Sequence, residues 1–244
     1  MPVVRDIPFK LNKIDVLRGL GMGASPSVRP EIDRLIDETL QDEAALNLIQ
    51  PVLAYDIHSI LKINGEDCYL DGGATFHGAT IPRLFPQAKA LVLAVATIGP
   101  GLEAKVTECF RQGQRLGGLI LDAMGTSSTE NLRFAIRSII SKEAEKRGYT
   151  VSSPVSPGGA GWPLTEQFKL FTLVPADAIG VHLTKTAMMV PRKSTSMVFG
   201  LGENMPVWSA TERCDMCPNG QNCPYRYQPE HECENSDTHE PALH

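Results

Sequence analysis

Residues 156–202 read SPGGAGWPLTEQFKLFTLVPADAIGVHLTKTAMMVPRKSTSMVFGLG, and this stretch decides the fold. With the two residues before it, its first part gives PVSPGGAGWP at positions 154–163. Because proline lacks the backbone donor that helices and central strands need, this part is a loop. Its backbone at Gly158 and Gly159 can approach a ligand closely. Trp162 has two interpretations: it lines a ligand cleft with a flat surface, or it packs in the core while the glycines only permit tight turning.

The remainder of this stretch predicts one helix and two extended segments. Leu164–Leu173 has the spacing of a short helix, and Pro175 ends it. The segments at 181–189 and 193–199 predict a pair of strands. The glycines at the end of the stretch then close the folded domain at Gly202.

Upstream, the hydrophobic spacing predicts further helices and strands. The predicted helices lie at 13–20, 30–47, 79–85 and 101–112, and the predicted strands lie at 52–63, 68–70 and 90–97. The run ALVLAVAT at 90–97 is apolar at nearly every position, which is typical of a strand buried on both faces.

A helical pattern beginning at Arg115 is interrupted by the small polar run GTSST at 125–129. A long amphipathic stretch then continues from Glu130 to Lys146. Two explanations stay open for the interruption. The small residues allow a close crossing with another helix, or they form the polar lining of a ligand cleft to which Asp122 or Glu130 contributes.

Four cysteines near the C-terminus have the spacing C-x2-C-x5-C-x9-C; they are Cys214, Cys217, Cys223 and Cys233. A four-thiolate set suits an iron–sulfur cluster or Zn²⁺, and both interpretations stay open. Disulfides are the least favoured alternative, because Met1–Lys13 has no long apolar segment of the secretory kind. We therefore expect a reducing cytoplasm, in which the separate Cys68 and Cys109 are small buried side chains.

The composition is that of an ordinary globular protein. The chain has 244 residues, 42% of them hydrophobic and 21% charged, with a net charge of −5. This charge gives no electrostatic reason to expect a nucleic-acid partner. No apolar run reaches the roughly 18 residues that a membrane span needs, so we expect no membrane partner either.

Several segments together resemble a known family. They are residues 156–202, NKIDVLRGLGM (12–22), TIGPGLE (97–103) and LDAMGTSSTENL (121–132). They resemble the reactivation domain of cobalamin-dependent methionine synthase and, more closely, its free-standing relatives. The resemblance covers about residues 12–202. The cysteine segment lies outside it and looks like the C-terminal extension of certain anaerobic relatives.

The resemblance implies an α+β fold, in which a twisted, mainly antiparallel sheet carries flanking helices. A small cysteine-rich metal-binding segment follows this domain. We accordingly expect the activation-domain-like domain at 1–202, the cysteine-rich segment at 203–234 and a disordered tail at 235–244.

In the family, this domain binds S-adenosylmethionine and docks on a corrinoid protein. Gly158, Ser194, Ser196 and Gly200 fall on matching positions of its ligand site. Two other positions depart from the pattern: Pro154 replaces an arginine that should pair with the ligand carboxylate, and Gly159 replaces a tyrosine. The departures predict weak or absent binding of S-adenosylmethionine. Arg192 or Lys193 takes over the carboxylate, or both are simply solvated.

Two function classes follow. In the first, the chain is a reductive activator, a corrinoid-reactivating oxidoreductase linked to methyl transfer. It takes electrons from a low-potential donor and passes them through an iron–sulfur cluster to the cobalt of a corrinoid protein or methyltransferase. In the second, it is a non-catalytic corrinoid-binding protein whose cysteines hold structural zinc. An S-adenosylmethionine-dependent methyltransferase for another substrate is a third, weaker alternative.

Overall fold

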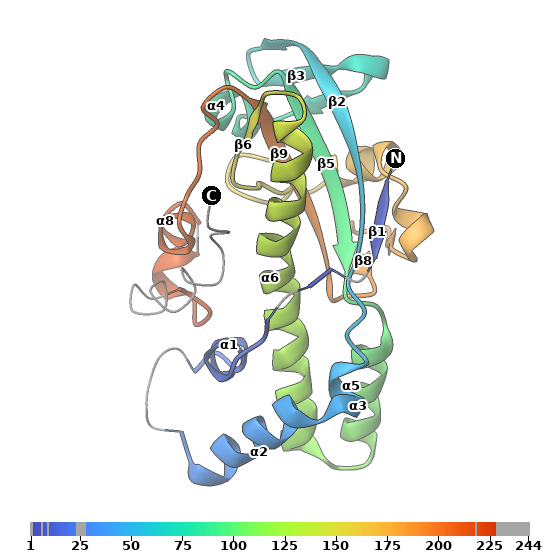
Figure 1. Cartoon of the computed structure of the whole chain (residues 1–244), viewed down its shortest axis with the longest axis vertical. Helices are drawn as coiled ribbons and strands as arrows, with labels where there is room; N and C mark the ends of the chain where they lie inside the picture. Colours follow the sequence, from blue (N-terminus) through green and yellow to red (C-terminus); the bar gives the residue numbers. More distant parts are fainter. Residues whose placement is uncertain (1, 6, 9, 23–27, 218, 228–244) are drawn as a thin grey trace.

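The computed structural model describes residues 2–5, 7–8, 10–22, 28–217 and 219–227 (Figure 1). Its centre is a twisted sheet in which every neighbouring pair of strands is antiparallel. The strand order is β4-β3-β2-β5-β9-β6, and β1 pairs with β2 beside this path. The strands are β1 (Val3–Arg5), β2 (Val52–Asn64), β3 (Asp67–Leu70), β4 (Thr75–His77), β5 (Ala90–Thr97), β6 (Thr150–Val151) and β9 (Ser194–Gly202).

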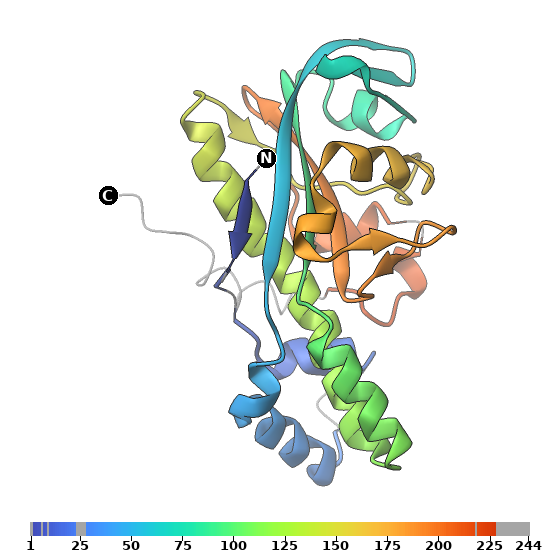
Figure 2. The same ribbon diagram turned by 90° about the vertical axis from the view of Figure 1, so that its right-hand side faces the viewer.

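Helices cover both faces of this sheet (Figure 2). One face packs on α6 (Arg115–Glu145), which runs the length of the molecule, together with α1 (Lys13–Gly19), α2 (Pro30–Gln41), α3 (Glu43–Leu46) and α5 (Gly101–Arg111). The other face packs on α4 (Thr80–Leu84), α7 (Glu166–Leu173) and the 3-10 turn η2 (Ala176–Ile179). No helix in the described ranges is long and apolar enough to cross a membrane.

The central strand β5 is buried at all eight positions. Alternate residues enter different cores: Val92 and Ala94 face the α6 side, while Leu91 and Leu93 face the α7 side. A strand between two helical layers needs apolar residues at both parities, which is why its run is continuous. The sequence-based expectation of a doubly buried strand is confirmed.

Two expected helices differ in detail. The helix at 115–145 is continuous, and GTSST lies inside it rather than interrupting it. The expected helix at 30–47 is broken at Asp42, whose carboxylate accepts the Ala44 amide and so caps α3. Side-chain capping therefore sets the boundary between α2 and α3, which the hydrophobic spacing does not reveal.

The expected pair of strands at 181–189 and 193–199 does not form. The first segment instead folds back on itself, and β7 (His182–Leu183) pairs with the short β8 (Met189–Val190) at its end. The second segment becomes β9, which pairs along its length with β5. The larger apolar surface of the buried β5 outweighs the local hairpin, because burial stabilises a strand more than sequence proximity does.

The segment 203–213, expected to be a linker, ends in a helix. Ser209 and Glu212 form a capping box that starts α8 (Ala210–Asp215). The turn η1 (Asp71–Gly73) follows β3, and η3 (Gly220–Asn222) follows α8. Helix α8 brings the first cysteine onto an ordered element beside α6.

Candidate functional site

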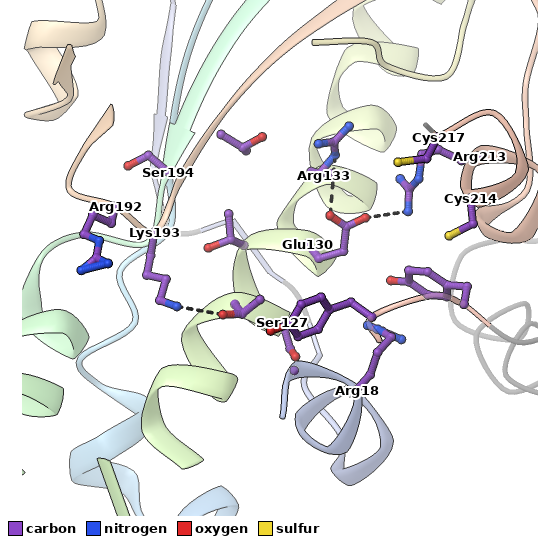
Figure 3. Close-up of a pocket in the computed structure, with 16 residues that line it drawn as sticks. Arg18, Ser127, Glu130, Arg133, Arg192, Lys193, Ser194, Arg213, Cys214 and Cys217 are labelled. Carbon is purple, nitrogen blue, oxygen red and sulfur yellow. Dashed lines mark hydrogen bonds and ion pairs between the residues drawn. The ribbon is translucent and has the colours of Figure 1, made fainter. Parts of the chain in front are cut away.

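A cavity of about 570 Å³ lies where α1, α6, the start of β9 and the cysteine segment meet (Figure 3). Hydroxyl side chains of α6 line one wall, and Ser194 lies at the β9 end. Cys214 and Cys217 line the opposite wall. The cavity thus joins the two parts of the chain that the sequence singled out separately.

The close crossing of α1 and α6 forms the floor of this cavity. A Cβ at Gly19 would lie 2.6 Å from the Ala123 carbonyl oxygen and 2.7 Å from Ser127 Oγ. The Ser127 hydroxyl donates a hydrogen bond to the Asp15 carbonyl at 2.5 Å. Ser127 also lines the cavity, as does Thr129. The small residues of GTSST therefore permit the close helix crossing, and its hydroxyl groups line the cavity; the ligand cleft itself stays a prediction.

Glu130 is the only acidic residue on the described lining. Its carboxylate lies 2.6 Å from Arg213 and 3.9 Å from Arg133. Burial opposes ionisation of this group, but the charges of Arg133, Arg213 and Arg18 outweigh it and hold the pKa of Glu130 below its ordinary value. Glu130 therefore joins α6 to α8 as a carboxylate between two guanidinium groups.

We expect Glu130→Gln to lower the free energy of unfolding at pH 7 by about 1–2 kcal/mol, because two guanidinium groups lose their partner charge. The pKa of Glu130 is lowered from 4.5 in the folded state. Its stabilising contribution is complete above the unfolded-state value and is lost as the pH falls through the folded-state value. The difference between wild type and variant should thus shrink below about pH 4.5 in urea-unfolding experiments. A difference that stays constant in acid would contradict this.

Arg18 is the most buried cation of the cavity, with a side chain only 7% exposed. One of its nitrogens lies 3.0 Å from Asp15, whose carboxylate also caps α1 and accepts from Asn131. The guanidinium carbon lies 3.9 Å from the centre of the Tyr227 ring. Arg18 is therefore held by Asp15 of its own helix and by Tyr227 of the cysteine segment.

The β9 end of the cavity carries Arg192 and Lys193, which the sequence analysis proposed as replacements for the missing arginine. The Lys193 ammonium lies 2.9 Å from Asp122 and donates to the Thr126 hydroxyl at 2.8 Å. Asp122 itself is half exposed and lies outside the lining. Arg192 is exposed and, within the described ranges, has no ion-pair partner.

The cysteine segment is anchored by an aromatic side chain. Tyr227 is 5% exposed and meets the Phe134 ring of α6 edge-on at a centroid distance of 6.5 Å. Within the segment, Arg226 pairs with Asp215 and donates to the Gly220 carbonyl at 3.2 Å. These contacts hold α8 and η3 against the main domain.

The thiols of this segment are the right kind of ligand for a soft metal but do not complete a site. Cys214, Cys217 and Cys223 are free and at least partly exposed. In the described ranges, no three His, Cys, Asp or Glu side chains gather as a metal site. Cys233, the expected fourth ligand, lies outside those ranges. The chain makes a tight turn after Cys214, because a Cβ at Gly220 would collide with the Cys214 carbonyl.

The other two cysteines are buried, as expected. Burial raises the pKa of the Cys68 thiol to about 11, so this group is protonated at neutral pH. Cys109 is 5% exposed and belongs to the core on the α6 side. Neither thiol is placed to bind a metal with the C-terminal set.

Several expected site residues lie away from the cavity. Trp162 is 3% exposed and meets Phe76 edge-on, so it packs in the core, the second of its two interpretations. A Cβ at Gly200 would collide with Met205, so packing accounts for this glycine. Ser196 is buried and donates to Gln167. These residues support the sheet on its α7 side.

The glycine loop is exposed at its tip. Gly158 has a φ of 87°, a backbone conformation that residues with a side chain rarely adopt. Gly159 does not have a positive φ. Ser156 ties the loop to β9 by donating to the Ser196 carbonyl at 2.6 Å. The loop therefore lies beside β9 and does not line the cavity.

The sequence patterns did not single out three of the cavity's arginines, Arg18, Arg133 and Arg213, or Tyr227. Arg133 had a signal, because it lies one helical turn after Glu130 in the amphipathic stretch. Arg213 follows the Ser-x-x-Glu capping motif at 209–212, which would have placed it on a helix. The sequence carries no signal for Arg18 and Tyr227, because their contact joins residues more than 200 positions apart.

The sheet order, the long helix along one face and the helices on the other define a mixed α+β domain of the reactivation-domain type. The chain is similar to the crystal structure of the MetH reactivation domain bound to AdoHcy. The TM-score is 0.60 and the identity 14%, over 84% of this chain and 79% of that chain. The fold expected from the resemblance is confirmed. No family model and no curated protein matches the chain.

Proposed function

We propose that this chain docks on a corrinoid protein and takes part in returning its cobalt to the active state. The observation that carries the proposal is the cavity in which the cysteine segment meets a domain with the fold of the MetH reactivation domain. Cys214 and Cys217 open onto this cavity. A metal centre on these thiols would therefore lie at the surface of the docking domain.

Cys214, Cys217, Cys223 and Cys233 are the residues that we propose to hold the centre. An iron–sulfur cluster there would supply one electron at low potential, which zinc cannot do. The residues of the chain have a positioning role. Tyr227 and the Arg213–Glu130 pair hold the thiols against α6. The cationic lining favours a bound anionic centre, because opposite charge lowers its free energy.

The test is anaerobic reduction of a corrinoid protein that carries cob(II)alamin, with titanium(III) citrate as electron source. One electron from the chain converts cob(II)alamin to cob(I)alamin, which is followed by absorbance. Wild type should accelerate this change, and Cys217→Ala should not. If wild type and variant give the same rate as reductant alone, the proposal is wrong.

The second candidate is an accessory protein with structural zinc. The missing arginine and tyrosine favour it, since Pro154 is buried and offers no charge to a ligand. Colour and metal analysis distinguish the two candidates. Brown protein with iron and sulfide supports the first, and colourless protein with one zinc supports the second.

We expect S-adenosylmethionine and AdoHcy to bind weakly. Losing a bidentate arginine contact costs about 2–5 kcal/mol, or roughly 30- to 3000-fold in affinity. Titration calorimetry with AdoHcy measures this directly. A low-micromolar dissociation constant would contradict the expectation, and its loss in Arg192→Gln would show which group had replaced the missing arginine.

A further inference from the structure

The residues that line the cavity have polar groups without hydrogen-bond partners, and the buried ones are hydrogen-bond donors. Arg18 Nη1 and Arg133 Nε are buried and have no hydrogen-bond partner among the described residues; the Glu130 carboxylate pairs with Arg133 Nε only at 3.9 Å, beyond hydrogen-bonding distance. The same holds for the Tyr227 hydroxyl. Burial raises the pKa of Tyr227, so its hydroxyl keeps its proton. A buried guanidinium N–H without a partner costs free energy, which a ligand with acceptor atoms would recover.

The acceptors near these donors are already engaged. The Glu130 carboxylate is held by Arg213 and Arg133. The Thr126 hydroxyl accepts from Lys193, and the Asp15 carboxylate accepts from Arg18. The cavity is therefore prepared for a molecule rich in acceptor oxygens.

The charges around the cavity also favour a ligand rich in acceptor oxygens. The cations on the lining are Arg18, Arg133, Arg192, Lys193 and Arg213. The carboxylates that pair with them in the described ranges are Asp15, Glu130 and Asp122. The cations outnumber the carboxylates by two, which a doubly charged anion would balance. A phosphate monoester has this charge near neutral pH, and guanidinium groups match its oxygens in pairs.

We propose that the cavity binds a small phosphorylated molecule, with its phosphate held by Arg18, Arg133 and the Tyr227 hydroxyl. A volume of about 570 Å³ lies within the range of small-molecule sites and accommodates more than the phosphate alone. The rings of Tyr225 and Tyr227 on the cysteine side give an organic group a surface to pack on. The thiols of Cys214 and Cys217 line the same cavity, but none of the three groups that we propose to hold phosphate is a thiol, so phosphate binding is measured separately from metal content.

Three probes distinguish free phosphate from the phosphate group of a nucleotide: inorganic phosphate, AMP and adenosine. Equilibrium dialysis of the full chain at low ionic strength should show saturable binding of inorganic phosphate and AMP and none of adenosine. Tighter binding of AMP than of phosphate would support a nucleotide, and equal binding would support the phosphate group alone. Equal binding of AMP and adenosine would overturn the proposal.

Variants locate the site. Arg133→Gln should weaken phosphate binding by about ten- to a hundredfold, the usual loss for a hydrogen bond to a charged group. Tyr227→Phe removes a buried donor but keeps the ring, so it should fold even if the Arg133 variant does not, and it should weaken binding by about two- to tenfold. Arg34→Gln removes the same charge from the exposed face of α2 and is the matched control. No saturable phosphate binding, or an equal loss in the control, would overturn the proposal.

Discussion

Replacing Cys217 by alanine is expected to remove most of the metal that the anaerobically purified protein carries. The side chain is exposed and makes no core contact, so the variant should keep its fold while it loses a ligand. Structural metal sites with a ligand removed bind far more weakly, because the remaining thiolates cannot close the coordination shell. Iron, zinc and acid-labile sulfide should be measured per chain, together with far-ultraviolet circular dichroism.

The buried cysteines provide the matched controls. Cys68→Ala and Cys109→Ala should retain all of the metal and lose at most a few kcal/mol of stability, as for other buried truncations. Alanine variants of Cys214, Cys223 and Cys233 should behave like Cys217→Ala. Full metal retention in all four single variants would refute the four-cysteine site.

Tyr227→Ala should release the cysteine segment from the main domain. The truncation removes the ring contact with Phe134 and the contact with the Arg18 guanidinium. Deleting a buried aromatic side chain costs about 3–5 kcal/mol. Because the lost contacts lie between the segment and the main domain rather than inside the sheet cores, we expect local opening rather than global unfolding. Amide hydrogen exchange in α8 should accelerate by about a hundredfold or more, at 1.4 kcal/mol for each factor of ten.

Tyr227→Phe is the control for this release. The Tyr227 hydroxyl has no hydrogen-bond partner among the described residues, so phenylalanine keeps every contact that anchors the segment. Exchange in α8 should stay near the wild-type rate, and exchange in β5 should be unchanged in both variants. Equal protection of α8 in the alanine variant and wild type would show that the anchor lies elsewhere, for example at Arg213–Glu130.

These variants also separate the two proposals. Cys217→Ala removes a metal ligand without changing Arg18, Arg133 or Tyr227, which we propose to hold phosphate. Retained phosphate binding with lost metal and lost reactivation would support two independent sites. Loss of phosphate binding in Arg133→Gln with normal metal content would support the same conclusion from the other side.

The secondary structure near the centre of the chain was readable from sequence. The apolar run at 90–97 predicted a doubly buried strand, and β5 fills that role. The expected partner of 193–199 was wrong, because strand pairing depends on which surfaces are left to bury after the helices have packed. Likewise, Trp162 had two interpretations until the position of Phe76 on β4 placed this loop residue in the core.

By itself, the sequence determined the segments, the cysteine set and, through its family resemblance, the α+β fold. The tertiary structure decided which side chains share a cavity. Arg18, Arg133 and Tyr227 meet there from three elements far apart in the chain. Their approach depends on the close crossing at Gly19 and on the docking of the cysteine segment. Local spacing reports the neighbours within one helix or strand, whereas such a meeting depends on how whole elements pack, which no local pattern contains.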